Sequence, residues 1–216
     1  MLYFIYILLC NQKTYSVGIT DNLEKKIKKH KMKNQIKRLI QSIKPFDTLE
    51  AEHISNTIEW IESGVEIFRI EKPAIPPKHL VSYFVLIDPE KRKIMLVDHI
   101  KAELWLPAGG HVEKNEHPNI TVEREIQEEL NIPAEFIDTN PFFITQTVTV
   151  GKTAGHTDVS FWYVLKADST KEIFYDPGEF NGYQWFDYEE ILKTDISKFD
   201  PHMHRFAKKL FASNLV

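Results

Sequence analysis

The sequence predicts an α+β fold in which helices cover a mixed β-sheet, with a small basic ββα segment in front of it. Two observations predict the main fold: runs rich in β-branched and aromatic residues recur through the second half, and helix-like segments lie between and after them. A third is the chain's size. Its 216 residues, 43% of them hydrophobic, can bury a sizeable core and fit one domain with an appendage.

The N-terminal segment differs from the rest of the chain in its charge. Between residues 21 and 44 there are nine Lys and Arg residues against two acidic ones, although the whole chain has a net charge of -4. We therefore expect a basic segment at 1–45 and a more acidic main domain at 46–216. The opening MLYFIYILLC is too short to span a bilayer and is expected to form a buried strand.

A single cysteine, Cys10, bears on the compartment. One cysteine cannot form an internal disulfide, so that the simpler expectation is a reducing, cytoplasmic environment and no membrane association. Cys10 itself is interpreted as a small apolar residue of the first strand and not as a reactive thiol.

Apolar spacing predicts the elements of the main body. Ile54, Ile58 and Ile61 recur at helical spacing before Gly64, which predicts a helix. The next two apolar runs are joined by the turn-prone PEKR and should pair with each other. The expected elements are helices at 50–64, 121–130 and 201–213, strands at 80–88, 93–99, 142–150 and 158–166, a short strand within 104–113, and a strand running into a helix at 182–192.

The segment REIQEEL, residues 124–130, predicts a metal site. On a helix, Glu125, Glu128 and Glu129 share one face, where like charges repel unless a positive charge lies among them. Hard divalent cations prefer oxygen ligands, so Mg²⁺ would resolve the repulsion. Arg124 can orient or neutralise a glutamate, and Gly109 and Gly110 upstream allow close approach of the backbone to a metal or a phosphate. The opposite helix face is apolar and can dock on the sheet through Val122, Ile126 and Leu130.

The stretch GHVEKNEHPNITVEREIQEELNI, residues 110–132, resembles the Nudix box of MutT-like hydrolases. Asn131 stands where the family has glycine, at a helix end where asparagine is the next most tolerant residue for a left-handed C-cap. The resemblance extends from about residue 76 to 195. The positions in register are Gly110, Glu116, Arg124, Glu125, Ile126, Glu128, Glu129 and Ile132.

This resemblance implies a Nudix-type α/β/α sandwich and an Mg²⁺-dependent hydrolase, with Mn²⁺ as the alternative metal. The substrate class would be a small nucleoside di- or triphosphate derivative whose diphosphate linkage is cleaved by an activated water, with a glutamate as base. Which glutamate is the base, and which nucleotide is the substrate, stay open. The implied residues are Glu125, Glu128, Glu129 and the Gly110 carbonyl for the metal; Glu128, Glu125, Arg124 and Glu179 for catalysis; and Gly109, Gly110, Glu116 and His111 for the substrate.

Several further side chains could contact a substrate, although each has a plain structural interpretation. Three histidines lie close to the expected site along the chain, and three aromatic residues lie on strands where they could stack on a base. Strand alternation predicts that at least one of these aromatic residues faces the core. The histidines are His111, His117 and His156, and the aromatic residues are Tyr83, Phe161 and Trp162.

The N-terminal residues 3–31 resemble the first half of a GIY-YIG nuclease domain, with two strands followed by a basic helix. Tyr6 and Tyr15 would match its catalytic tyrosines, and Lys26 stands at the position of its arginine, without the planar fork that binds phosphate. We expect this segment to be a packing appendage or a homodimer element. A nucleic-acid-binding remnant that uses residues 21–44 is the second expectation, and an active nuclease is the last.

Two other functions compete with hydrolysis. A nucleotide-binding regulatory module could use the same fold without turnover, although the complete set of box glutamates argues against it. An isomerase of isoprenoid diphosphates can share this fold but would need a cysteine near the box to act as its acid. Cys10 is far from the box in sequence.

Overall fold

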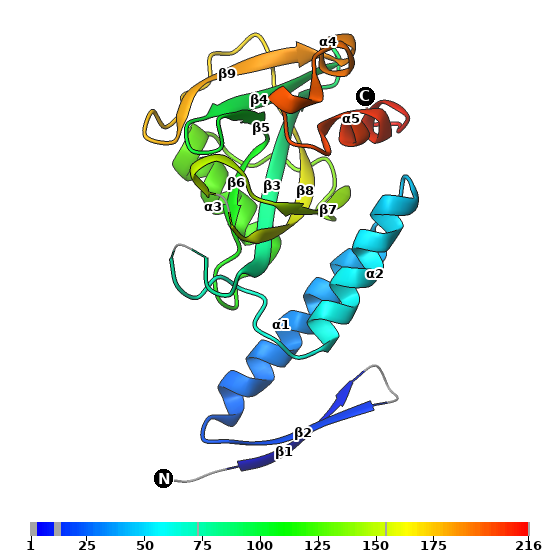
Figure 1. The fold of residues 1–216 in the computed structure, drawn as a ribbon, viewed down its shortest axis with the longest axis vertical. Helices are drawn as coiled ribbons and strands as arrows, with labels where there is room; N and C mark the ends of the chain where they lie inside the picture. The colour runs from blue at the N-terminus through cyan, green and yellow to red at the C-terminus, as the bar shows by residue number, and fades with distance from the viewer. Residues whose placement is uncertain (1–3, 11–13, 73, 154, 216) are drawn as a thin grey trace.

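The computed structural model describes residues 4–10, 14–72, 74–153 and 155–215. They form a seven-stranded mixed sheet with helices around it, and a separate two-stranded hairpin (Figure 1). The strands of the large sheet are β3 (Lys78–Asp88), β4 (Lys93–His99), β5 (Leu104–Leu106), β6 (Ala108–His111), β7 (Phe143–Val148), β8 (Thr157–Lys166) and β9 (Phe180–Asp187). The helices are α1 (Leu23–Ser42), α2 (Thr48–Glu62), α3 (Pro118–Leu130), α4 (Tyr188–Lys193) and α5 (Met203–Phe211), with 3-10 turns η1 (Gly151–Thr153) and η2 (Ile196–Lys198).

The sheet has the strand order β5-β4-β3-β8-β7, with β6 also paired to β3 and β9 to β4. The expected pairing of the first two strands of the main body is confirmed by the register Ile87 to Ile94. Strands β3 and β8 run parallel over ten residue pairs, and the other pairings are antiparallel. Because β3 and β8 are far apart in the sequence, this parallel pair brings distant side chains together at the centre of the fold.

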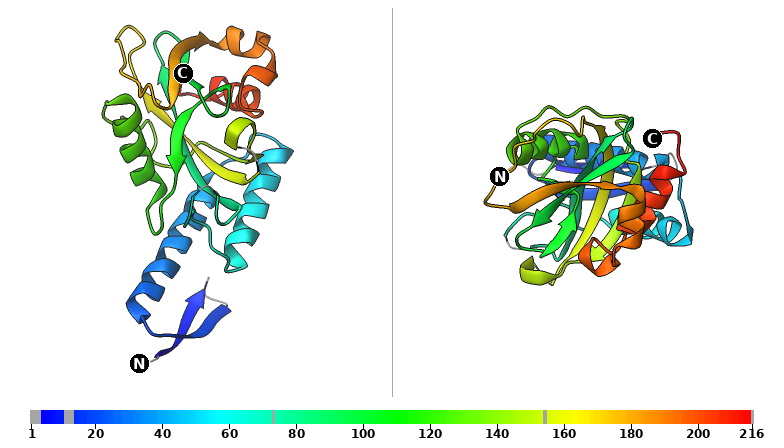
Figure 2. Two further views of the ribbon diagram at one scale, coloured as in Figure 1. Left: turned by 60° about the vertical axis from the view of Figure 1, so that its left-hand side comes forward. Right: turned by 90° about the horizontal axis from the view of Figure 1, so that it is seen from above.

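Helices pack on both faces of the sheet and confirm the predicted α+β class. The apolar side of α3 contributes Val122, Ile126 and Leu130 to one buried cluster, as its periodicity predicts. The helices α4 and α5 contribute Ile191, Phe206 and other residues to a second cluster. Figure 2 shows α3 and α5 on different sides of the strands.

Strand alternation separates two aromatic neighbours between the two clusters. Phe161 and Trp162 are both fully buried, one in each cluster. The expectation that at least one of them faces the core is therefore confirmed. Neither side chain is exposed for stacking on a base.

Element boundaries differ from the prediction where capping or proline intervenes. Helix α3 begins three residues earlier than expected, with Pro118 in its first turn and the His117 side chain accepting from the Asn119 amide. The expected strand in 104–113 is divided into β5 and β6 around Pro107, which has no amide hydrogen to donate. At the other end of α3, Asn131 has φ 52° and ψ 38°, which confirms the left-handed C-cap.

The N-terminal region is a hairpin followed by two packed helices, which confirms the expected ββα order. Strands β1 (Phe4–Cys10) and β2 (Thr14–Thr20) pair antiparallel beyond the start of α1, apart from the large sheet in both side views (Figures 1 and 2). The expectation that the first strand is buried is wrong for Ile5 and Ile7, which are 77% and 66% exposed. A two-stranded hairpin has two faces. Among the described residues, nothing covers the face that carries Ile5 and Ile7.

Helices α1 and α2 are part of the main core. Ile36 and Ile40 on α1 and Ile61 on α2 are buried in the same cluster as α3. At the other end of the chain, Arg205 on α5 donates to Asp47 at the start of α2. No helix in the described part of the chain is long and apolar enough to cross a bilayer.

Candidate active site

The side chain of Arg124 lies among the glutamates of α3 and of the preceding loop. Its guanidinium nitrogens lie 2.6 Å from Glu125 Oε1, 3.1 Å from Glu116 Oε2 and 3.6 Å from Glu128 Oε2. Hydrogen bonding to Glu116 raises the pKa of Arg124 further above its ordinary value, and the charge of Glu125 adds to this. One arginine therefore offsets the repulsion that the sequence predicts on this helix face.

Glu116 braces the loop between β6 and α3. Its carboxylate accepts hydrogen bonds from the Thr121 hydroxyl (2.8 Å), the Glu113 amide (3.0 Å) and Arg124. Burial raises the pKa of Glu116, but these donors, Arg124 first, outweigh burial and the net shift is downward. Glu116 is consequently an ionised anchor that fixes the entry into the glutamate helix.

Two glycines of β6 bring the backbone against the same carboxylates. The Gly109 amide donates to Glu129 Oε2 over 3.1 Å. Gly109 has φ +140°, and a Cβ there would lie 2.2 Å from the carbonyl oxygen of Ser82. At Gly110 a Cβ would lie 2.0 Å from Glu125 Oε1. Both positions therefore require glycine, one for backbone conformation and contact and the other for contact alone.

Burial and mutual repulsion disfavour the ionised forms of two carboxylates of α3, Glu125 and Glu129. Burial raises the pKa of Glu129 to about 9, and the charges of Glu125, Glu179 and Glu128 add to this. Burial also raises the pKa of Glu125, against the opposing effect of Arg124. A cation among these oxygens would favour the ionised forms, so the donor set fits a hard divalent metal ion. Glu128 is the exposed member of the three, with 61% of its side chain accessible.

The structure brings Glu179 close to this group. The Asp176 amide donates to the Glu129 carbonyl oxygen over 2.8 Å, which joins the loop before β9 to the end of α3. The Glu179 carbonyl accepts from the Ile100 amide over 2.9 Å. The charge of Glu179 raises the pKa of both Glu125 and Glu129, which places its carboxylate within electrostatic reach of the site.

The three histidines singled out in the sequence go to two different places. His117 caps α3. His111 and His156 lie with His79 and Asp158 in a group whose ligating atoms are all within 4.8 Å of one another. Burial, with the charge of Arg69, lowers the pKa of His111 to about 3, so this imidazole is neutral at ordinary pH. The group is a candidate metal cluster in its own right.

Sequence reasoning missed Arg69, which lies between these two groups. It belongs to the segment joining α2 to β3, and its Nη1 lies 3.4 Å from His111 Nε2. Burial lowers the pKa of Arg69, and the negative charges of Glu125 and Asp158 work in the opposite direction. No motif marks this residue. It enters the site because the Leu80 amide, near the start of β3, donates to the Ile67 carbonyl and fixes the segment alongside the sheet.

The site is thus a helix docked on a sheet that carries paired glutamates, with an arginine among them and glycines beneath them, which is an arrangement suited to holding a hard divalent cation. The family model for the NUDIX domain matches residues 78–207, more than half of the chain, and the chain belongs to the Nudix family. It is an enzyme of the pyrophosphohydrolase type, and its family uses divalent metal ions. No curated protein shows significant sequence similarity to the chain.

Solved structures of Nudix proteins resemble the main domain. A NUDIX-family hydrolase from Clostridium perfringens has 22% sequence identity and a TM-score of 0.48, with 62% of this chain and 97% of that chain covered. The MutT protein from Methanosarcina mazei has 20% identity and a TM-score of 0.48, with 62% and 94% covered. An Ap4A hydrolase from C. elegans has 17% identity and a TM-score of 0.46, with 61% and 96% covered.

The N-terminal segment matches a second family model, the GIY-YIG catalytic domain, over residues 2–70. This range includes α2, whereas the sequence prediction placed the domain boundary after residue 45. The side chains of Tyr6 and Tyr15 lie outside the part of the chain that the structure describes.

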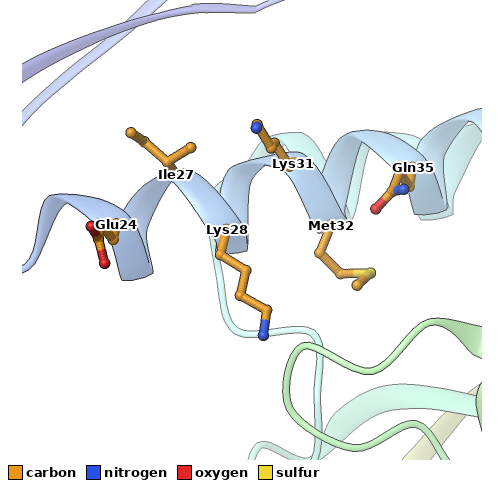
Figure 3. A pocket seen from close by; sticks show the side chains of 6 residues that line it. All are labelled: Glu24, Ile27, Lys28, Lys31, Met32 and Gln35. Carbon is orange, nitrogen blue, oxygen red and sulfur yellow. The ribbon is translucent and has the colours of Figure 1, made fainter.

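The basic helix of this segment, α1, carries charges of both signs at its N-terminal half. A shallow hollow along α1 is lined by Lys28 and Lys31 together with Glu24 and the apolar Ile27 and Met32, and Figure 3 shows how these side chains project from the helix. In the same part of the helix, Lys29 lies 2.9 Å from Glu66. The use of residues 21–44 for nucleic acid stays a prediction.

Proposed function

We propose that this protein is a Mg²⁺-dependent pyrophosphohydrolase that cleaves the diphosphate linkage of a small nucleoside di- or triphosphate derivative, with Mn²⁺ as a substitute metal. The observation that carries the proposal is the clustering of Glu125 and Glu129 around Gly109 and Gly110. These carboxylates repel one another and are largely buried. A hard cation bound among them would reduce this repulsion.

The residues that would hold the metal are Glu125, Glu128, Glu129 and the carbonyl of Gly110. When bound, such a cation supplies neutralisation of the diphosphate oxygens and Lewis acidity toward the attacking water. Metal loading would also account for Glu129 as an ionised ligand, because a nearby positive charge lowers the pKa that burial raises.

The remaining chemistry belongs to the protein's own groups. Arg124 holds Glu125 in place and is itself held by Glu116, so the carboxylate geometry is fixed before substrate arrives. A glutamate accepts the proton of the attacking water, and the exposed Glu128 and the loop residue Glu179 are the two we favour. The lack of side chains at Gly109 and Gly110 lets β6 lie against the Ser82 backbone and the Glu125 carboxylate, which keeps these two groups close together.

The test is metal-dependent turnover of a substrate panel. Nucleoside triphosphates, oxidised nucleotides, dinucleoside polyphosphates and nucleotide sugars are incubated with the full chain and Mg²⁺, and released phosphate or nucleoside monophosphate is measured. Glu128→Gln removes a ligand charge and is expected to lower kcat/KM by about 100-fold or more, since metal-based stabilisation of the transition state is worth several kcal/mol. Glu123→Gln, an exposed position on the same helix, is the matched control and should retain activity.

Two results would contradict the proposal. Turnover that persists with a chelator, or equally in Glu128→Gln and wild type, would remove the glutamates from catalysis. Tight binding of a nucleotide without turnover of any panel member would instead favour the alternative of a regulatory module that binds nucleotides.

A further inference from the structure

Four side chains that the catalytic proposal does not use converge beside the glutamate site. His79 comes from β3, His111 from the end of β6, His156 from the turn before β8, and Asp158 from β8. The parallel register places His79 directly beside Asp158, and β6 pairs with β3 so that His111 faces Val81. Sheet topology alone assembles this group, which we call the histidine cluster.

The centre of the histidine cluster has two unsatisfied polar atoms. His79 is fully buried, and its Nδ1 lies 2.8 Å from the carbonyl oxygen of Pro76, an acceptor that fixes the proton on Nδ1. The lone pair of Nε2 then faces Oδ1 of Asp158 across 3.4 Å. Asp158 Oδ1 also lies 3.3 Å from His156 Nε2, but among the described residues neither His79 Nε2 nor Asp158 Oδ1 has a hydrogen bond of good geometry. Two facing acceptors require a proton or a cation between them.

The spacing of the cluster fits a four-coordinate metal. Ligand atoms about 2.0–2.1 Å from a tetrahedral centre are about 3.3–3.4 Å from each other. His79 Nε2 and His156 Nε2 lie 3.4 Å and 3.3 Å from Asp158 Oδ1, and every ligating atom of the four residues is within 4.8 Å of the others. Two edges of a tetrahedron are thus in place, and His111 supplies the fourth ligand atom within the same group.

The surroundings have the features of an orienting outer shell. Metal-bound histidines usually direct the second ring nitrogen to a carbonyl, a carboxylate or another polar group. The Pro76 carbonyl does this for His79, and the Thr149 hydroxyl lies 3.2 Å from His156 Nδ1. The positive charge of Arg69 opposes a cation near His111, whereas Asp158 and Glu125 favour one.

We propose that His79, His111, His156 and Asp158 bind a divalent transition metal of the Zn²⁺ class, at a site separate from the Mg²⁺ ligands of α3. Three imidazoles and one carboxylate suit Zn²⁺ and its neighbours in the first transition row, whereas Mg²⁺ prefers an all-oxygen set. Four protein ligands fill a tetrahedral shell, so this is a structural site with no open position for substrate. It joins β3, β6 and β8 next to Gly110.

The experiment uses the full chain, stripped with a chelator and then titrated with Zn²⁺ by calorimetry and with Co²⁺ by visible absorption. Wild type is expected to bind one equivalent of Zn²⁺ that millimolar Mg²⁺ does not displace, and Co²⁺ should show the intense bands of four-coordinate geometry. Asp158→Asn and His156→Gln should each raise Kd by more than about 100-fold, beyond the 10–100-fold typical of outer-shell changes. Glu125→Gln/Glu128→Gln should retain both the Zn²⁺ equivalent and the Co²⁺ bands.

Two outcomes would overturn this site. One is the absence of stoichiometric Zn²⁺ binding to the folded wild type, which would leave a proton between His79 and Asp158. The other is binding that survives in both cluster variants and is lost in the glutamate variant. Circular dichroism of the metal-free variants checks that each change leaves the fold intact. Because no turnover is measured, failure of the hydrolase proposal would not affect this result.

Discussion

The backbone of Gly110 lies directly against the carboxylate of Glu125, so that a Cβ added to the glycine would come within 2.0 Å of Glu125 Oε1. The same oxygen is paired with Arg124 over 2.6 Å. Glu125 therefore cannot retreat from a side chain at position 110 without breaking this ion pair. The position of one proposed metal ligand depends on the absence of a side chain at its neighbour.

Gly110→Ala is expected to lower kcat/KM by about 100-fold or more while leaving the fold intact. The added methyl group displaces the Glu125 carboxylate, and misplacement of a reacting group by about 1 Å can cost about 10²-fold in rate. Steady-state kinetics with the best substrate of the panel measures the effect. Gly182→Ala is the matched control, because a Cβ there meets no atom within 4 Å. Equal activity of the two variants would show that Glu125 can move without consequence.

Arg69→Met is expected to raise KM for a nucleotide substrate by about tenfold, with a smaller effect on kcat. The guanidinium is half-buried between the glutamates and the histidine cluster, where a planar fork of donors can pair with phosphate oxygens of a bound substrate. A change confined to KM indicates loss of uniform binding. Lys72→Met removes an exposed positive charge three residues away and should leave KM unchanged. A KM effect of the same size in both variants would point to general surface charge instead.

The part of the site that is local in sequence could be predicted, and the part that depends on sheet register could not. Helical periodicity alone puts Glu125, Glu128 and Glu129 on one face of the helix. Arg69, His79 and Asp158 carry no motif. His79 and Asp158 meet because β3 and β8 pair in parallel at a register that no single-sequence pattern specifies, and Arg69 is positioned by the hydrogen bond that holds the segment before β3 alongside the sheet.

The fold shows the same division between local and long-range information. The predicted strands and helices of the main body are observed within a few residues, because apolar spacing, caps and prolines act locally. The burial of the first strand was predicted wrongly, because hydrophobicity does not reveal whether a second layer covers a hairpin. Ile5 and Ile19, which face each other across β1 and β2, are 77% and 70% exposed.

The ion pair between Asp47 and Arg205 is expected to stabilise the fold fully above about pH 4 and to lose its contribution as the pH falls toward 2. Hydrogen bonding to Arg205 lowers the pKa of Asp47 from 3.8 to about 2, so the carboxylate is ionised when folded and protonates more readily when unfolded. Its contribution is complete above the unfolded pKa and is lost as pH falls toward the folded value. With about a third of the Asp47 side chain exposed, solvent screening limits the contribution to about 1 kcal/mol.

Asp47→Asn tests this pH dependence. Urea denaturation should give a free energy of unfolding about 1 kcal/mol below that of wild type at pH 6, and the difference should shrink as the pH is lowered from 4 to 2. Glu52→Gln, an exposed position on α2, should match wild type throughout. A difference that stays constant with pH would mean that Asn is deficient as the N-cap of α2 and that the ion pair contributes little.

Ile40→Ala is expected to lower the free energy of unfolding by about 2–5 kcal/mol, the usual cost of truncating a buried isoleucine. Ile40 is on α1 but is fully buried in the cluster that contains α3 and the sheet, so its removal leaves a cavity in the core of the catalytic domain. Fluorescence and circular dichroism should report one shared unfolding transition, since buried residues of α1 belong to the same hydrophobic cluster as those of the sheet. Leu49→Ala, at a position 40% exposed, should cost less than about 1 kcal/mol. An early, separate transition in Ile40→Ala, with the activity of the Nudix domain preserved, would instead make the N-terminal helices an independent unit.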